Sequence, residues 1–134
     1  MIYGIGIDIA EIARFERALA RFGARFPERI LDPRELRGLH EARQPGRYLA
    51  MRFAAKEATS KALGTGFKQG VAPRQIGVVH APSGKPGLAV SGQAQVLFDR
   101  HGIVASHVSL SDDGGFAIAY VVLETHQSEG QSRA

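Results

Sequence analysis

The chain contains no cysteine and no tryptophan among its 134 residues. The lack of cysteine excludes disulfides, thiolate metal sites and thiol redox chemistry, and it fits a reducing compartment. Long apolar runs are also missing, since none approaches the roughly 20 residues of a membrane-spanning helix. Residues 1–4 lack the basic start and long apolar stretch of a secretion signal. We therefore expect a cytoplasmic protein without a membrane partner.

Basic side chains outnumber acidic ones, with 17 Lys and Arg against 13 Asp and Glu, a net charge of +4 and a pI near 9.9. This surplus favours an anionic partner, whether a nucleotide, a polynucleotide or an acidic protein. Aromatic residues make up only 7% of the chain, so few rings remain to stack on bases. A small basic nucleic-acid-binding module is therefore the alternative, and we expect no nucleic-acid partner.

The length allows one ordinary domain and not two, and the 44% hydrophobic content supplies a core. Helical periodicity dominates the first half, and strand patterns dominate the second half. The two halves should share one core, which predicts an α+β domain over residues 1–125 with its helices packed on a small antiparallel sheet. Residues 126–134 are polar and are predicted to form a disordered tail.

The first half begins with alternating Gly and Ile at residues 4–7, a pattern typical of a short buried strand, which we expect to end at Asp8. Apolar residues at steps of three and four then predict an amphipathic helix over residues 12–26, which Gly23 ends or kinks. Asp32 is followed by Pro33 and Glu35, the signature of a helix N-terminus with the aspartate as N-cap.

A long alanine-rich helix is predicted over residues 47–63, closed by Gly64. Ser91 is placed to cap another helix that reaches residue 100. The Asp-Asp-Gly-Gly sequence at residues 112–115 is a hairpin signal between two strands. The predicted strands of the second half cover residues 76–79, 88–90, 107–111 and 116–124.

Two acids, Asp8 and Glu57, could meet at one divalent cation, since Mg²⁺ takes oxygen ligands from one or two carboxylates, waters and phosphates. The structural alternative is that Asp8 caps the next helix and that Glu57 pairs with Lys61 one helical turn later. Spacing alone leaves both interpretations open.

A phosphate-binding function is possible at the end of the same helix. Lys56, Lys61 and the backbone amides of Gly64, Thr65 and Gly66 could hold a pyrophosphate. The alternative is an ordinary glycine C-cap, and a helix C-terminus repels anions, so the lysines would have to dominate.

Four arginines, which we call the arginine ridge, follow the helical period beside the apolar stripe. They are Arg14, Arg17, Arg21 and Arg25. Such a ridge could dock an acidic helix of another protein, could follow a nucleic-acid backbone, or could be a solvated face.

Four segments, taken together, resemble the holo-acyl-carrier-protein synthase family of small 4′-phosphopantetheinyl transferases. They cover residues 4–9, 53–66, 84–86 and 107–111. The likeness extends from residue 1 to about residue 124, with the segments in the family's order and spacing. Members of this family transfer the phosphopantetheine arm of coenzyme A to a serine hydroxyl of apo acyl carrier protein and release adenosine 3′,5′-bisphosphate.

The resemblance implies that Asp8 and Glu57 bind Mg²⁺ and that Lys61 stabilises the charge that develops on the phosphates. Metal-bound water, Glu57 or Asp8 would take the serine proton, and the sequence does not choose among them. It also leaves open Mg²⁺ against Mn²⁺ and the identity of the carrier protein.

The resemblance further implies a homotrimer with active sites between neighbouring subunits. Coenzyme A would contact Lys61, Gly64 and Thr65 of one subunit and Gly84, Lys85 and Pro86 of the next, with Arg47 and Arg52 as additional phosphate contacts. The arginine ridge (Arg14, Arg17, Arg21 and Arg25) would bind the acidic carrier protein, with Phe22 and Phe26 as apolar contacts.

Two positions depart from relatives of this family. Asp112 stands where many relatives have a histidine, so Lys85 or His107 would have to replace any phosphate contact that this histidine makes. Ala10 stands where the larger two-domain transferases carry a second acid, which indicates the small trimeric branch with an extra water on the metal.

Overall fold

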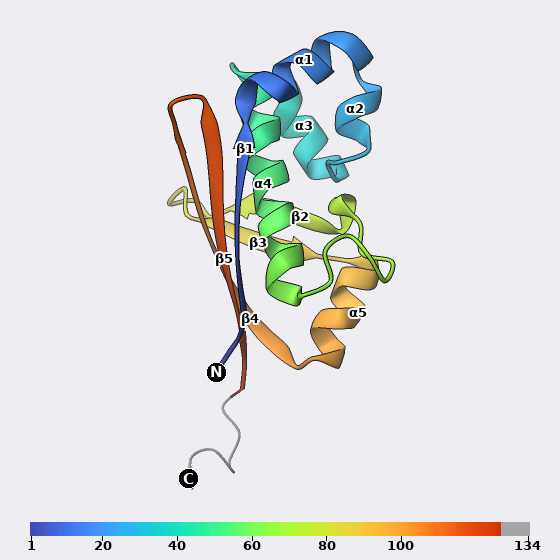
Figure 1. Cartoon of the computed structure of the whole chain (residues 1–134), viewed down its shortest axis with the longest axis vertical. Helices are drawn as coiled ribbons and strands as arrows, with labels where there is room; N and C mark the ends of the chain where they lie inside the picture. The colour runs from blue at the N-terminus through green and yellow to red at the C-terminus, as the bar shows by residue number, and fades with distance from the viewer. Residues whose placement is uncertain (127–134) are drawn as a thin grey trace, which may run out of the picture.

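The computed structural model describes residues 1–126 of the chain (Figure 1). The predicted tail therefore lies, apart from the exposed His126, outside the described residues. In chain order the elements are β1 (Ile2–Glu11), α1 (Ile12–Phe22), α2 (Arg25–Glu28), α3 (Pro33–Glu41), α4 (Pro45–Leu63), the 3₁₀ turn η1 (Pro73–Gln75), β2 (Ile76–His80), β3 (Pro86–Val90), α5 (Gly92–Arg100), β4 (Ile103–Asp113) and β5 (Phe116–Thr125).

Helices and antiparallel strands are combined as the α+β prediction requires. One sheet has three strands in the order β1-β5-β4, and the other is the β2–β3 hairpin. In Figure 1, α4 runs along the long axis beside β1, with α1 to α3 at one end of the molecule and α5 at the other. Within the described residues, none of the helices is both long and apolar enough to span a bilayer.

The contact between β1 and α4 depends on two glycines. A Cβ atom on Gly6 would overlap the carbonyl oxygen of Ala58, and one on Gly4 would overlap that of Ala62. The helix can approach this closely because it presents small buried side chains there, Ala58 and Ala62 among them. The alternation of Gly and Ile is therefore the pattern of a strand with one face against helix backbone.

The prediction that β1 ends at Asp8 is wrong. The strand continues to Glu11 because Asp8 pairs with Ala119 and Ala10 with Ala117 on β5. Successive side chains of a strand alternate between faces, so Asp8 lies on the same face as Gly6, toward α4. The isoleucines at positions 5, 7 and 9 lie on the opposite face and are exposed.

The other helix boundaries agree with the sequence in most details. Gly23, with a φ of 60°, ends α1, so the predicted helix over residues 12–26 is divided in two. Asp32 caps α3, with 2.8 Å from the Glu35 amide nitrogen to Asp32 Oδ1. Gly64 ends α4 in the left-handed conformation. Ser91 precedes α5 but makes no side-chain capping bond, which corrects its predicted role.

We expect Gly6→Ala to destabilise the fold by about 1–3 kcal/mol, because the added methyl group would force β1 and α4 apart. Urea denaturation at a fixed protein concentration measures this change. Gly87→Ala is the matched control, since a Cβ there would meet only Val79 Cγ2, at 3.7 Å. Equal stability of the two variants would contradict the proposed steric limit.

Candidate active site

Asp8, Glu57 and Lys61 come together where β1 crosses α4. The Lys61 ammonium lies 3.0 Å from Asp8 Oδ1 and donates a second hydrogen bond, also of 3.0 Å, to the carbonyl oxygen of Ile7. The Asp8 side chain is only 17% exposed, whereas that of Lys61 is 51% exposed, so the lysine also reaches solvent. The adjoining surface hollow has a volume of about 390 Å³ and is lined by Ile7, Asp8, Ile9, Lys61 and Ile118.

The pKa of Glu57 depends on the charge of Asp8. Burial raises the pKa of Glu57, the nearby charge of Asp8 raises it further, and Lys61 and Arg14 oppose both effects. A carboxylate that is disfavoured in its ionised form by a neighbouring negative charge is one that a bound cation stabilises. The influence of Arg14 also shows that the arginine ridge on α1 begins close to this site.

The structural alternatives for these residues can now be judged. Asp8 does not cap α1, because the N-cap position is Glu11, three residues further along the chain. The ion pair of Lys61 is with Asp8 on the neighbouring strand, so this lysine is not merely a partner of Glu57 along the helix. The predicted meeting of Asp8 with α4 thus occurs, although through the strand's register and not at its end.

Lys56 is not available for a phosphate, contrary to the expectation from sequence. Its side chain is 0% exposed, and its ammonium lies 2.6 Å from Glu35 Oε1 and 2.5 Å from the carbonyl oxygen of Ile76. Adjacent helix residues point about 100° apart, so Lys56 faces the interior while Glu57 faces β1. Burial lowers the pKa of Lys56, and the charge of Glu35 opposes that shift.

The amides after α4 do not form the predicted phosphate cradle either. The backbone N–H groups of Gly64, Thr65 and Gly66 donate to the carbonyl oxygen of Ser60, over 3.1, 3.2 and 3.2 Å. The Thr65 hydroxyl donates to the carbonyl oxygen of Gly66. The last carbonyls of a helix lack helical partners, and the following amides satisfy one of them here. Any contribution of Gly64 and Thr65 to coenzyme A binding stays a prediction.

Arg47 is held by Asp112, at the position where the resemblance leads us to expect a histidine in many relatives. Its Nε and Nη2 donate to the two carboxylate oxygens of Asp112, over 2.9 and 2.8 Å. This bidentate hydrogen bonding lowers the pKa of Asp112. Asp112 therefore orients Arg47, and a phosphate at Arg47 would compete with it.

The two residues expected to replace that histidine lie elsewhere. His107 is on the opposite face of β4 from Asp112, where its ring pairs with Glu124 over 2.5 Å. Lys85 is exposed near the tip of the β2–β3 hairpin. Within one chain, His107 thus faces away from Arg47.

Arg52 lies mostly buried against α3. Its guanidinium carbon is 3.6 Å from the centroid of the Tyr48 ring, and its Nε is 4.0 Å from Glu35 Oε2. That Nε is buried and has no hydrogen-bond partner among the described residues. Burial of His80, the last residue of β2, lowers its pKa, and the charge of Arg52 lowers it further. Arg52 therefore lies toward the turn end of the β2–β3 hairpin. Its phosphate contact stays a prediction.

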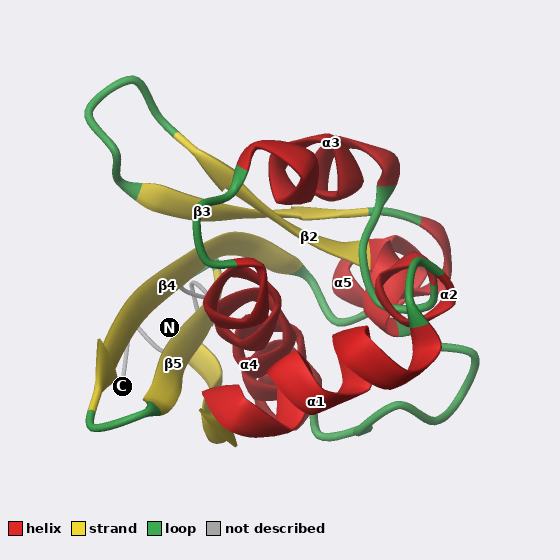
Figure 2. Cartoon of the chain, turned by 90° about the horizontal axis from the view of Figure 1, so that it is seen from above, coloured by secondary structure: helices red, strands yellow, loops and turns green. Residues whose placement is uncertain are grey.

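The hairpin tip with Gly84, Lys85 and Pro86 projects away from the body of the chain (Figure 2). Residues 81–85 are exposed, and Gly84 has a φ of 90°, which favours glycine. The Gly84 amide donates to the carbonyl oxygen of Ala81, which closes the turn. This loop is therefore open to solvent.

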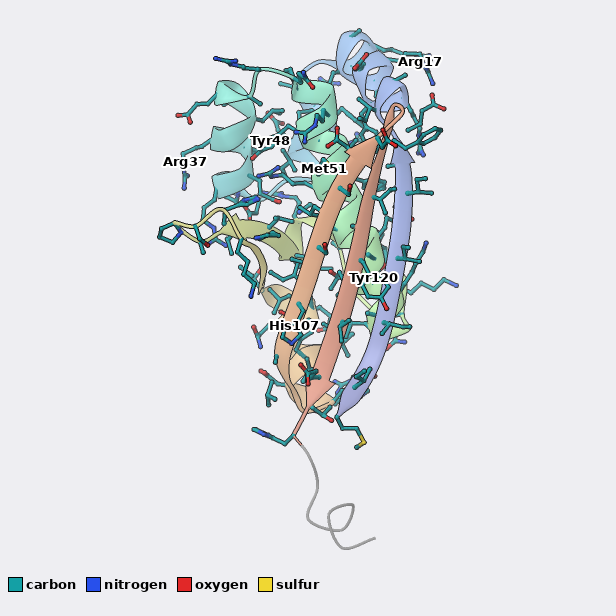
Figure 3. All side chains as sticks on the ribbon, turned by 90° about the vertical axis from the view of Figure 1, so that its left-hand side faces the viewer. Arg17, Arg37, Tyr48, Met51, His107 and Tyr120 are labelled. Carbon is teal, nitrogen blue, oxygen red and sulfur yellow. The ribbon has the colours of Figure 1, made fainter. Side chains whose placement is uncertain are left out.

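The arginine ridge is exposed along α1 and α2, and Figure 3 labels Arg17 near this end of the molecule. The guanidinium carbon of Arg21 lies 5.2 Å from the centroid of the exposed Phe22 ring. Beside it is a surface hollow of about 500 Å³, lined by Phe22, Arg25, Phe26 and Arg29. The ridge therefore borders an opening with aromatic walls.

Sequence reasoning missed two arginines of this surface. Arg29 and Arg74 line a second hollow, of about 490 Å³, together with Arg25 and Glu28. Arg29 follows Arg25 at a helical interval, a signal that could have identified it. Arg74 comes from η1, and only the tertiary structure brings it there.

Two carboxylates and an exposed lysine beside a basic surface are groups suited to phosphate transfer from an anionic substrate. Comparison with known proteins identifies the class. The family model of the 4′-phosphopantetheinyl transferase superfamily matches residues 4–121. The chain belongs to this superfamily, and it is a transferase.

Within this superfamily, the chain is clearly similar to proteins named holo-[acyl-carrier-protein] synthase. The holo-[acyl-carrier-protein] synthase of Vibrio cholerae is 52% identical over 124 residues, which cover 92% of this chain and 98% of that protein. The enzyme of the same name from Neisseria meningitidis has a crystal structure with a TM-score of 0.88 and 42% identity, covering 93% of this chain and 100% of that one. The Helicobacter pylori structure, in complex with coenzyme A, has a TM-score of 0.78 and 37% identity, with coverages of 90% and 99%. These matches confirm the predicted family and fold.

We expect Asp8→Asn to lower the pKa of Glu57 toward its ordinary value, because the substitution removes a negative charge that disfavours the ionised carboxylate. Carbon-detected NMR titration in a buffer without divalent ions measures the shift. Asp113→Asn, in the exposed β4–β5 turn, should leave the pKa of Glu57 unchanged. A rise on Asp8→Asn, or no change, would show that the two carboxylates are not coupled.

Proposed function

We propose that this chain transfers the 4′-phosphopantetheine arm of coenzyme A to a serine hydroxyl of an apo acyl carrier protein and releases adenosine 3′,5′-bisphosphate. The observation that carries the proposal is the meeting of Asp8, Glu57 and Lys61 in a chain of this family. Holo-[acyl-carrier-protein] synthases are among the proteins to which it is similar, and the structure of one from Bacillus anthracis, at 39% identity, is in complex with coenzyme A (3′,5′-ADP). Family membership outweighs the alternative of a nucleic-acid-binding module.

Asp8 and Glu57 would hold the Mg²⁺ ion that this reaction uses. Both are hard oxygen donors, and the effect of the Asp8 charge on the pKa of Glu57 indicates a site that favours a cation. No group of three or more Asp, Glu, His or Cys side chains suited to a metal occurs in residues 1–126. Waters and substrate oxygens would therefore supply the remaining ligands. When bound, Mg²⁺ neutralises the diphosphate and acts as a Lewis acid.

Lys61 has the position of an electrostatic stabiliser. In the transfer, the serine oxygen bonds to the phosphorus on the pantetheine side, and the bond from that phosphorus to the bridging oxygen breaks. Negative charge grows on the leaving phosphate, and a positioned ammonium stabilises it most in a partly desolvated site. Lys61 meets this requirement, because its ammonium is held 3.0 Å from the mostly buried Asp8 carboxylate while about half of the lysine side chain stays exposed.

The outer face of the three-stranded sheet supports a homotrimer. Ile5, Ile7 and Ile9 are 56–61% exposed, and Phe116 and Tyr120 on β5 are 42% exposed. Figure 3 shows this face, with Tyr120 and His107 on it, and no helix of the described residues lies over it. A contiguous apolar face of this kind marks a protein interface. In a ring, the projecting Gly84–Pro86 loop would complete the coenzyme A site of a neighbour.

The arginine ridge and the adjoining hollow would dock the carrier protein. An acidic helix would meet Arg14, Arg17 and Arg21 by charge complementarity, and an apolar side chain would enter beside Phe22. Arg14 also acts on the pKa of Glu57, so a partner on the ridge lies next to the catalytic groups.

The absence of cysteine fits the cytoplasmic location that we propose.

The decisive test incubates the protein with an apo acyl carrier protein, coenzyme A and Mg²⁺, followed by the intact mass of the carrier. We expect a gain of one phosphopantetheine group. Glu57→Ala should reduce the rate by a factor of about 100 or more, because one of the two acidic ligands is lost. Sedimentation checks that the variant keeps the assembly state of the wild type. No mass gain with the wild type would refute the transferase function, and full activity of Glu57→Ala would remove its metal role.

We expect Arg21→Glu to raise the KM for the carrier protein by about tenfold at low salt and to leave the KM for coenzyme A unchanged. The reversal replaces attraction to an acidic helix by repulsion. Arg100→Glu on α5, at the opposite end of the molecule, is the control with the same charge change. Equal effects of the two reversals would indicate that only net charge matters and that the ridge is not the docking site.

A further inference from the structure

One edge of β2 is covered by side chains instead of a strand. The other edge pairs with β3. The hydrogen bond from the Ser91 amide to the carbonyl oxygen of Gln75 shows that the backbone N–H and C=O groups of the odd-numbered residues of β2 point toward β3. Peptide groups of alternate strand residues point to opposite edges, so the N–H and C=O groups of Ile76 and Val78 face away from β3. These buried backbone groups need partners from elsewhere in the chain.

A buried ion pair supplies the partners of two of these groups, the Ile76 carbonyl and the Val78 amide, while the Ile76 amide donates to the carbonyl oxygen of Pro73. The Val78 amide donates to Glu35 Oε2 over 3.1 Å, and Lys56 donates to the carbonyl oxygen of Ile76. The ammonium and Glu35 Oε1 are 2.6 Å apart, and the two side chains are 0% and 2% exposed. The Lys56–Glu35 pair thus provides one donor and one acceptor to β2, as a neighbouring strand would.

Each half of the pair is anchored in a different helix. Glu35 Oε1 also accepts from the Asp32 amide in the capping box of α3, and Gly77 leaves room for the Asp32 side chain against β2. Lys56 is on α4, directly before Glu57, and donates a third bond to the carbonyl oxygen of Pro73 in η1. The pair therefore joins α3, α4, η1 and β2 at one point.

We propose that Lys56 and Glu35 are positioning residues, which hold the β2–β3 hairpin and its Gly84–Pro86 loop at a defined place relative to α4. This inference rests on the proposed function, in which the loop contacts coenzyme A and α4 carries Glu57 and Lys61. In a ring, the loop and the helix of one chain serve two neighbouring sites. The pair then determines how well both halves of each coenzyme A site match.

The proposal predicts a selective kinetic effect. The double variant Lys56→Met/Glu35→Met removes both charges and replaces them with side chains of similar length, which buried sites often tolerate. We expect its KM and its calorimetric Kd for coenzyme A to rise by about tenfold, the effect typical of lost supporting contacts around a site. The KM for the carrier protein should stay unchanged, because Arg14, Arg17 and Arg21 lie on α1, whereas the pair joins α3, α4, η1 and β2.

Amide hydrogen exchange gives a second readout that does not depend on activity. The Val78 amide should exchange faster in the double variant, whereas that of Val79, which faces β3, should keep its protection. Should the double variant fail to fold, Lys56→Gln/Glu35→Gln removes both charges but keeps polar groups, and the same two measurements apply. Arg37→Met, which removes an exposed cation from α3, is the control for general effects on that helix (Figure 3).

Each outcome decides the question. A folded double variant with wild-type affinity for coenzyme A, or with a loss in maximal rate alone, would show that the pair serves stability only and would overturn the proposal. Unchanged exchange at Val78 would overturn the role at the strand edge. Failure of the wild type to bind coenzyme A or to modify the carrier would refute the proposed function itself, a result distinct from a difference between variant and wild type.

Discussion

The close approach of α4 to β1 is the constraint on which the site depends. Gly4 and Gly6 let the backbone of the helix lie against the strand, and the small side chains of α4 meet them there. Residues two apart on a strand share a face, so the same approach that needs glycine at position 6 directs Asp8 toward the helix. One packing contact therefore both builds the core and brings an acid to Glu57 and Lys61.

The two lysines of α4 point in different directions and have different surroundings. Lys56 is fully buried against Glu35 and β2, whereas the side chain of Lys61 is half exposed beside Asp8. A charged group can be buried only when its hydrogen bonds are satisfied, and Glu35 together with the carbonyl oxygens of Pro73 and Ile76 satisfies them for Lys56. The interior lysine thus joins the surrounding elements, and the outer one, although paired with Asp8, is accessible from solvent.

The sequence predicted the element types well, because their signals are local. The capping box at Asp32 and Glu35, the left-handed Gly64 and the hairpin glycines at 114 and 115 each depend on neighbours in the chain. It could not decide between two outcomes where one local pattern allows both. Glycines after a helix suit an anion or a C-cap, and the free carbonyl of Ser60 took the amides in this case.

Residue chemistry by itself determined that the chain has an α+β fold, that it resembles phosphopantetheinyl transferases, and that Asp8, Glu57 and Lys61 are the groups to consider. Only the tertiary structure decided that Asp8 faces the helix from mid-strand, that Asp112 holds Arg47, and that Arg74 joins the basic surface. Backbone propensity and capping act over a few residues, whereas the partner of a charged side chain depends on which distant segments pack against it.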